Sequence, residues 1–225
     1  MGTVIGDLLP LGLGVAISPV PIIAVILMLL APRAGAASAG FGLGWVLGIV
    51  VVTVVVLAVA SGSDVGGTST EPSTAASWTK LVLGVLLLLV GAWQWRGRPK
   101  SGDPAPLPKW MAAVDTVTPV KASGLGFLLS AVNPKNLLMC IAAGVTIAGG
   151  GLDAGQDSVA VVVFTVIAAS TVLVPVIGYA VARQQMRRPL DDLKVWLQQN
   201  NVTVMAVLLL VIGVALAGKG LGGLL

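Results

Sequence analysis

The stretch Ser130-Ala131-Val132-Asn133-Pro134-Lys135-Asn136 interrupts an apolar run that extends from Ala122 to Leu152. A lysine, two asparagines and a helix-breaking proline stand where a bilayer-spanning segment would ordinarily hold only apolar side chains. A related break, Ile17-Ser18-Pro19-Val20-Pro21, lies near the middle of the earlier run Leu8–Pro32. We interpret these two breaks as the two halves of one site inside a membrane protein.

The composition places the chain among membrane proteins. Its residues are 56% hydrophobic and 10% charged, and its mean hydropathy of +1.01 lies far outside the soluble norm. Six charge-poor runs are long enough, or nearly so, for a hydrocarbon core that takes about 20 residues to cross. They are Leu8–Pro32, Gly40–Ser61, Leu81–Trp95, Ala122–Leu152, Ser158–Ala182 and Val195–Gly218. We therefore predict an all-α polytopic membrane protein with six transmembrane helices.

The sequence lacks the residues that metal binding, dithiol chemistry and enzymatic catalysis usually require. The chain has no histidine and one cysteine, Cys140, which leaves almost no ligands for a transition metal and no dithiol. It also has no paired intramembrane carboxylates and no serine–base or cysteine–base pair to activate a nucleophile. We expect neither an enzyme nor a cofactor.

The net charge of +4 does not indicate nucleic-acid binding, because the charges follow the membrane topology. The loops after the first, third and fifth runs are basic, whereas those after the second and fourth carry the acidic residues. The basic set is Arg33, Arg96, Arg98, Lys100, Lys109, Lys121, Arg183, Arg187, Arg188 and Lys194, and the acidic set is Asp64, Glu71, Asp153 and Asp157. Since basic loops stay in the cytoplasm, we predict that both termini lie outside.

Three connecting segments are expected to be loops or linkers. Ser61–Ser77 is rich in Ser, Gly and Thr. Residues 96–121 form a basic cytoplasmic linker, within which Lys109–Val117 has the spacing of a short helix on the inner membrane surface. Arg183–Asn201 is expected to be a basic, amphipathic loop.

Each break carries the signals that start a new helix. Ser18 and Asn133 are suitable N-caps, and Pro19 and Pro134 suit the first helical position. Counting 1.5 Å per residue from Ala122 puts Asn133 at a depth of roughly 17 Å, near the bilayer midplane. The free N–H groups of the second half-helix, together with Lys135, would attract an anion there. The predicted substrate-binding residues are Ser18, Pro19, Pro21, Asn133, Pro134, Lys135 and Asn136.

The depth of Lys135 favours a functional role. A lysine at the middle of a spanning helix costs about 2.5–3.5 kcal/mol on insertion scales, and such residues commonly mark a pathway. The alternative is that the carbonyl groups freed at the broken helices hold the Lys135 ammonium and that no ligand binds.

Gly40, Gly44 and Gly48 recur every four residues and form a stripe of small residues. Such a stripe lets another helix approach closely, so we predict a helix-packing role. The stripe suits a contact within the chain as well as a homodimer.

The two breaks also point to an internal repeat. Placing Ser18-Pro19 on Asn133-Pro134 aligns the halves at an offset of 115 residues, each with one broken helix followed by two continuous ones. Because each unit has three spans, the second is inverted relative to the first, which is a recurrent transporter plan. The predicted units are residues 1–95 and 122–225, joined by the linker 96–121.

Four stretches of the chain together resemble a known family. They are Ile17-Ser18-Pro19-Val20-Pro21, Leu43-Gly44-Trp45-Val46-Leu47-Gly48, Pro108-Lys109-Trp110 through Asp115, and Gly126-Phe127-Leu128-Leu129-Ser130-Ala131-Val132-Asn133-Pro134-Lys135-Asn136-Leu137-Leu138. The family that they resemble is that of the Gap-like proteins, which includes the sulfolipid-addressing protein within the LysE-type exporter superfamily. The family's motif asparagine, proline and lysine fall on Asn133, Pro134 and Lys135. The resemblance implies a six-helix bacterial inner-membrane protein that helps to bring glycopeptidolipid or sulfolipid to the surface of lipid-rich actinobacterial envelopes.

Three functions follow from these observations. The leading hypothesis is a transporter, or the partner of a larger lipid exporter, for an anionic envelope lipid whose headgroup meets Lys135 at midplane. The second is an exporter of small molecules such as amino acids, in which backbone carbonyls at the breaks would bind the substrate's amine. The third is a scaffold that assembles a lipid-export complex through its basic loops.

Overall fold

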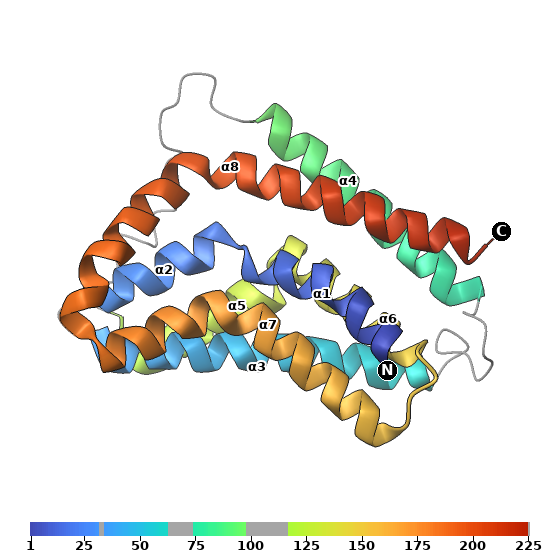
Figure 1. Ribbon diagram of the computed structural model, residues 1–225, viewed down its shortest axis with the longest axis horizontal. Helices are drawn as coiled ribbons and strands as arrows, with labels where there is room; N and C mark the ends of the chain where they lie inside the picture. Colours follow the sequence, from blue (N-terminus) through green and yellow to red (C-terminus); the bar gives the residue numbers. More distant parts are fainter. Residues whose placement is uncertain (32–33, 63–73, 98–116, 225) are drawn as a thin grey trace.

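The computed structural model describes residues 1–31, 34–62, 74–97 and 117–224 and is all-helical over these ranges, as the sequence predicts (Figure 1). Its helices are α1 (Gly2–Ala16), α2 (Pro19–Leu30), α3 (Ala34–Ser61), α4 (Thr74–Arg96), α5 (Pro119–Ala131), α6 (Pro134–Ala148), α7 (Ala154–Val181) and α8 (Arg183–Gly222). Arg33, the Ser61–Ser77 loop from 63 to 73, and the predicted helix Lys109–Val117 up to 116 lie outside the described residues.

Four helices, α3, α4, α7 and α8, are each long and apolar enough to cross a membrane. Two further pairs pass the same test together but are bent at a short break, α1 with α2 by 54° and α5 with α6 by 66°. The described part of the chain therefore offers four spans, or six if each bent pair is one span. It is a multi-pass membrane protein.

Helix α8 differs from the prediction of a loop at Arg183–Asn201. It runs without interruption for 40 residues, with Pro189 inside it. At 1.5 Å per residue this is about 60 Å, twice the hydrocarbon thickness of a bilayer. Figure 1 shows its first part crossing one end of the molecule and the rest running beside α4. Leu190 and Leu197 explain the helical continuation, because they lie seven residues apart and are both buried.

The glycine stripe lies against α5 within the same chain. A Cβ atom added to Gly40 would overlap the carbonyl oxygen of Pro119, and one added to Gly44 would overlap that of Ser123. Gly48 has no room either, because the Ser130 hydroxyl fills the space beside it. Helices α3 and α5 therefore run parallel with their backbones in close contact.

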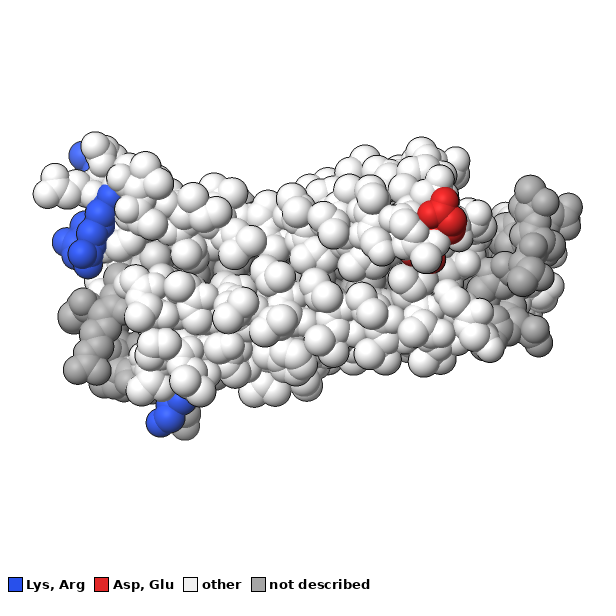
Figure 2. Space-filling view, turned by 90° about the horizontal axis from the view of Figure 1, so that it is seen from below, with Lys and Arg blue, Asp and Glu red and all other residues white. Residues whose placement is uncertain are grey.

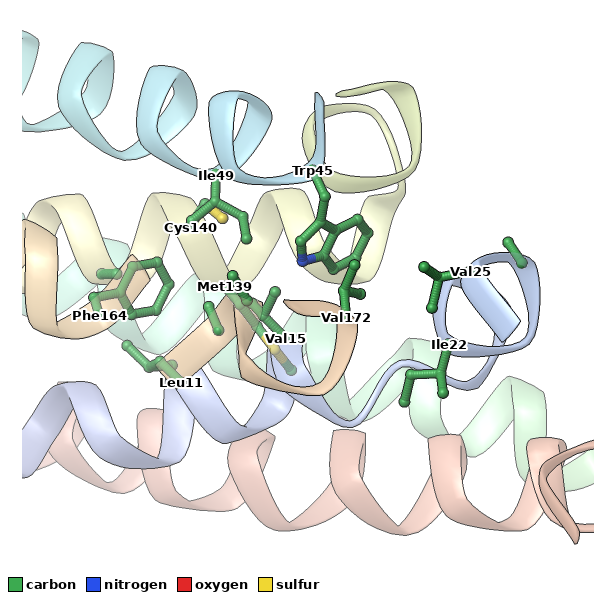
Figure 3. Packing of buried hydrophobic residues seen from close by; sticks show 14 of the residues in the cluster. Leu11, Val15, Ile22, Val25, Trp45, Ile49, Met139, Cys140, Phe164 and Val172 are labelled. Atoms are coloured by element: carbon green, nitrogen blue, oxygen red, sulfur yellow. The ribbon is translucent and has the colours of Figure 1, made fainter. Parts of the chain in front are cut away.

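The core forms where the bent pairs meet α3 and α7. Figure 3 shows Leu11 and Val15 of α1 pointing toward Met139 of α6, with Phe164 of α7 and Ile49 of α3 on either side. All five side chains are buried. This apolar packing surrounds the α1 break and fixes α6 and α7 against it.

The two ends of the molecule carry opposite charge on the face that Figure 2 shows, with a long uncharged surface between them. At the basic end α2 and α7 finish while α3, α5 and α8 begin, and both chain termini lie at the other end (Figure 1). At that other end Lys219 of α8 forms an ion pair with Asp7 of α1. The charge pattern is that of a protein whose uncharged belt faces lipid.

Candidate functional site

The two half-helices begin at the predicted residues. Helix α2 starts at Pro19 after Ser18, and α6 starts at Pro134 after Asn133. The Asn133 side chain caps α6, because its Oδ1 accepts a hydrogen bond from the Lys135 backbone N–H at 3.1 Å. Ser18 occupies the corresponding position of α2, but its hydroxyl makes no capping bond to that helix.

The Lys135 side chain crosses from α6 to the end of α1. Its ammonium donates to the carbonyl oxygen of Gly14 at 2.5 Å, to the Ser18 hydroxyl at 2.6 Å and to the carbonyl oxygen of Ile17 at 3.3 Å. The lysine is 2% exposed. These contacts join residues at least 117 positions apart in the sequence and bring the two breaks together.

Asn136 completes the connection on the side of α6. Its Oδ1 lies 3.0 Å from the Ser18 hydroxyl, and its Nδ2 donates to the Leu129 carbonyl of α5 at 3.0 Å. The Ser18 hydroxyl accepts from Lys135 and can donate either to Asn136 Oδ1 or to the Val15 carbonyl at 2.7 Å. Ser18 and Asn136 are both fully or almost fully buried. One hydroxyl thus links the lysine, the asparagine and α1.

Every carbonyl that α1 leaves without a helical partner at its C-terminus finds a donor here. Lys135 serves Gly14 and Ile17, the Ser18 hydroxyl serves Val15, and the Thr171 hydroxyl of α7 donates to Ala16 at 2.5 Å. The last four carbonyls of a helix are normally orphaned and costly to bury. The site therefore supplies hydrogen-bond donors to carbonyls that would otherwise be buried without partners at the first break.

The charge of Lys135 is balanced by dipoles. Within the described ranges Lys135 forms no ion pair with a carboxylate. The carbonyls around its ammonium belong to the C-terminal end of α1, which carries the negative pole of the helix dipole. The expectation that the Lys135 charge adds to the N-terminus of α6 differs from this geometry, since the side chain extends away from its own helix and across to α1. In this state the ammonium is held by freed carbonyls, as the alternative interpretation describes.

The predicted site residues fall into three groups. Lys135 and Asn136 each bond to the Ser18 hydroxyl, while Asn133, Pro134 and Pro19 shape the helix starts on which these three residues depend. Pro21 is buried in the first turn of α2. The glycine stripe lies along α3 and packs on α5 instead of entering this network.

Sequence reasoning missed Gly14, Ile17 and Thr171 as members of the site. The first two act through backbone carbonyls, which no side-chain pattern reveals. Thr171 follows Ser170, whose hydroxyl bonds back to its own helix at Ile167, and nothing in the sequence separates the two hydroxyls. The only available signal was that a broken helix must leave carbonyls to be satisfied.

One family model matches the chain, over residues 8–222, and its description is Sap, sulfolipid-1-addressing protein. No match was found among curated proteins or among solved structures. The matched range contains both breaks, the glycine stripe and every residue of the Lys135 network. The chain belongs to the sulfolipid-1-addressing protein family.

Proposed function

We propose that this protein moves an anionic envelope lipid, such as a sulfolipid or glycopeptidolipid, across the bacterial plasma membrane, or helps a larger exporter to do so. It acts without enzymatic chemistry or a cofactor, and its partners are membrane lipids and, where it is accessory, that exporter. Family membership supports a role in sulfolipid addressing. The single observation that carries the proposal is a buried lysine that joins two broken helices.

The proposed architecture is six spans in two inverted three-helix repeats, as in exporters of the LysE type. The helix contacts support it. Gly12 of α1 packs on Phe164 of α7, and Gly48 of α3 packs on Phe127 of α5. Gly12 and Phe127 are 115 residues apart, and Gly48 and Phe164 are 116 apart, so offsets that differ by one residue interchange the two contacts. Equivalent contacts between equivalent helices are what a two-fold repeat produces.

In the proposed orientation the basic end faces the cytoplasm and both termini face outward. The two termini lie at the same end of the molecule, opposite the basic end, which agrees with an even number of spans (Figure 1). Labelling single cysteines placed in the Arg183–Lys194 segment tests this, because a membrane-impermeant reagent added to intact cells should leave them unmodified. Labelling from outside would reverse the orientation.

We propose that Lys135 exchanges partners during transport. In the described state its ammonium binds the Gly14 and Ile17 carbonyls; in the substrate-bound state a sulfate or carboxylate headgroup replaces them. An anion interacts more strongly with an ammonium than a neutral carbonyl does. When the ammonium leaves the Gly14 and Ile17 carbonyls for the headgroup, the C-terminal end of α1 is released. Headgroup binding would therefore favour movement of one repeat against the other.

Export in a deletion strain tests this proposal. Lys135→Gln should abolish surface display of the lipid, because glutamine keeps a donor but lacks the charge that attracts an anion. Lys121→Gln is the matched control, since it removes an exposed lysine from α5 of the same bent pair. Unchanged export by Lys135→Gln and Lys135→Ala, with normal protein levels, would rule out the site.

The same variants separate the other two functions. Export that survives Lys135→Gln but is lost on truncation within residues 96–121 would identify a scaffold. Uptake of labelled amino acids by inside-out vesicles would identify a small-molecule exporter. In the described state the carbonyls that such a substrate's amine requires are occupied by Lys135, which favours the anion over the amine.

A further inference from the structure

A pocket lies at the basic end, where the last turn of α2 meets the first part of α8. Its apolar wall is formed by Leu27, Leu30 and Ala31 of α2. Its polar wall is formed by Arg187, Asp191 and Lys194 of α8. The pocket is about as polar as it is apolar and is open to the surface, in contrast to the closed Lys135 network.

The charges in this pocket are unequal. Lys194 pairs with Asp191 at 2.7 Å, so those two largely cancel. Arg187 forms no ion pair with any carboxylate in the described ranges, and its side chain is exposed. Its guanidinium hydrogen-bonds with Tyr179, and the remaining N–H donors lie in the planar arrangement that binds sulfate and phosphate esters.

The apolar residues around Arg187 favour a ligand with both a charged headgroup and acyl chains over a free ion. The segment of α8 that crosses the basic end anchors itself through Leu190 and Leu197 and also exposes Leu193 and Trp196, which suits the interface between water and lipid. The two leucines of the α2 wall are only partly buried. A headgroup at Arg187 would therefore have its acyl chains beside Leu27 and Leu30, in contact with apolar surface.

We propose that the pocket between α2 and α8 binds the sulfate or phosphate ester headgroup of a membrane lipid in the cytoplasmic leaflet. Arg187 provides the charge, and Leu27 and Leu30 provide the surface for the chains. This is a loading site, distinct in place from Lys135. It rests on the proposed function for its role in transport, but its binding activity stands alone.

Native mass spectrometry of the full chain in a neutral detergent tests the binding, with a sulfated glycolipid as probe. Arg187→Gln should weaken binding about tenfold, the order of one charge-assisted hydrogen bond. Arg188→Gln is the matched control, because it removes the same charge from the adjacent exposed residue, which does not line the pocket, and should change binding less than twofold. Equal losses in the two variants would mean diffuse attraction to a basic surface and would overturn the site.

A variant that is expected to tighten binding distinguishes a specific effect from misfolding, because misfolding would only weaken binding. Asp191→Asn removes the carboxylate that opposes an anion and frees Lys194, so it should tighten binding severalfold. A weaker or unchanged affinity would contradict the proposal. Inorganic sulfate alone, at matched ionic strength, should not displace the lipid, and displacement at equal concentration would assign the pocket to a free anion.

Failure here and failure of the transport proposal are distinguishable. Lys135→Gln should abolish export while leaving lipid binding at the α2–α8 pocket unchanged, whereas Arg187→Gln should weaken binding and slow export. If Lys135→Gln weakened lipid binding to the same extent as Arg187→Gln, the two sites would be one and the separate loading site would be wrong.

Discussion

The two helix breaks start alike and are stabilised differently. The second break is closed locally, because Asn133 caps α6 through a residue two positions away. The first break also places a polar residue before a proline, Ser18 before Pro19, but it has no side-chain cap. The Ser18 hydroxyl bonds the Val15 carbonyl, while the Gly14, Ile17 and Ala16 carbonyls receive side-chain donors, Lys135 and Thr171, from the other half of the chain. A local cap makes one break self-sufficient, whereas the other depends on tertiary contacts.

This difference assigns unequal roles to the two halves. The second half supplies the charge and one of the hydroxyls, and the first supplies acceptors that belong to the backbone. A break that takes two of its carbonyl donors from the single Lys135 ammonium can be loosened by competition for that one side chain. Movement should therefore begin at α1 and not at α6.

Removing the lysine is the strongest test of this dependence. Lys135→Ala should lower the free energy of unfolding by about 3 kcal/mol, because it leaves the Gly14 and Ile17 carbonyls buried without donors. Lys121→Ala, at an exposed position, should stay within about 0.5 kcal/mol of the parent. Steric trapping in bicelles measures both. Equal stabilities would show that water or other groups satisfy α1 just as well.

The next prediction compares two glycines beside the bent pairs, one packed against backbone and one packed against flexible side chains. Gly44→Ala should cost about 2 kcal/mol, because its Cβ would meet the backbone of α5 at Ser123, which cannot rotate away. Gly14→Ala should cost less, since the atoms around its Cβ are the ends of flexible side chains, Met139 and Ile212. Gly124→Ala is the control, with nothing within 4 Å. Thermal unfolding in detergent ranks the three, and a larger loss for Gly14→Ala would reverse the assignment of rigid and yielding walls.

Substitution of Ser18 tests whether the two breaks are energetically coupled. Ser18→Ala should cost about 1.5 kcal/mol, because the hydroxyl bonds both α1 and Asn136. Combined with Lys135→Ala, its cost should shrink, since the two residues share one network. A double-mutant cycle gives this coupling, and strict additivity would mean that the two breaks are independent.

The smallest effect is expected at the local cap. Asn133→Ala should cost about 1 kcal/mol, the usual value for loss of an N-cap. Because that cap serves only α6, its effect should add to that of Ser18→Ala. Measured in the same bicelles, a clear departure from additivity would show that the second break also depends on the first.

Interactions between residues close in the sequence were predictable, whereas those between distant residues mostly were not. The starts of α2 and α6 and the cap at Asn133 were predictable, because proline and asparagine act on their immediate neighbours. Ser18 was placed in one site with Lys135, and freed carbonyls were an alternative for holding its ammonium, but which carbonyls these are was not predictable. Gly14 and Ile17 contribute only backbone atoms, from more than 100 residues away. The helical start of α8 was missed although Leu190 and Leu197 lie seven residues apart, because the basic, amphipathic segment Arg183–Asn201 was interpreted as a loop.

The long reach of Lys135 has a consequence for biogenesis. When the first broken helix leaves the translocon, the side chains that will satisfy its carbonyls, on α6 and α7, have not yet been synthesised. The nascent first half must wait, with water or translocon groups satisfying those carbonyls, until residue 135 has been inserted. Chains interrupted before this point should be recognised by membrane quality-control proteases, which makes the midplane lysine a marker of completed assembly as well as a part of the site.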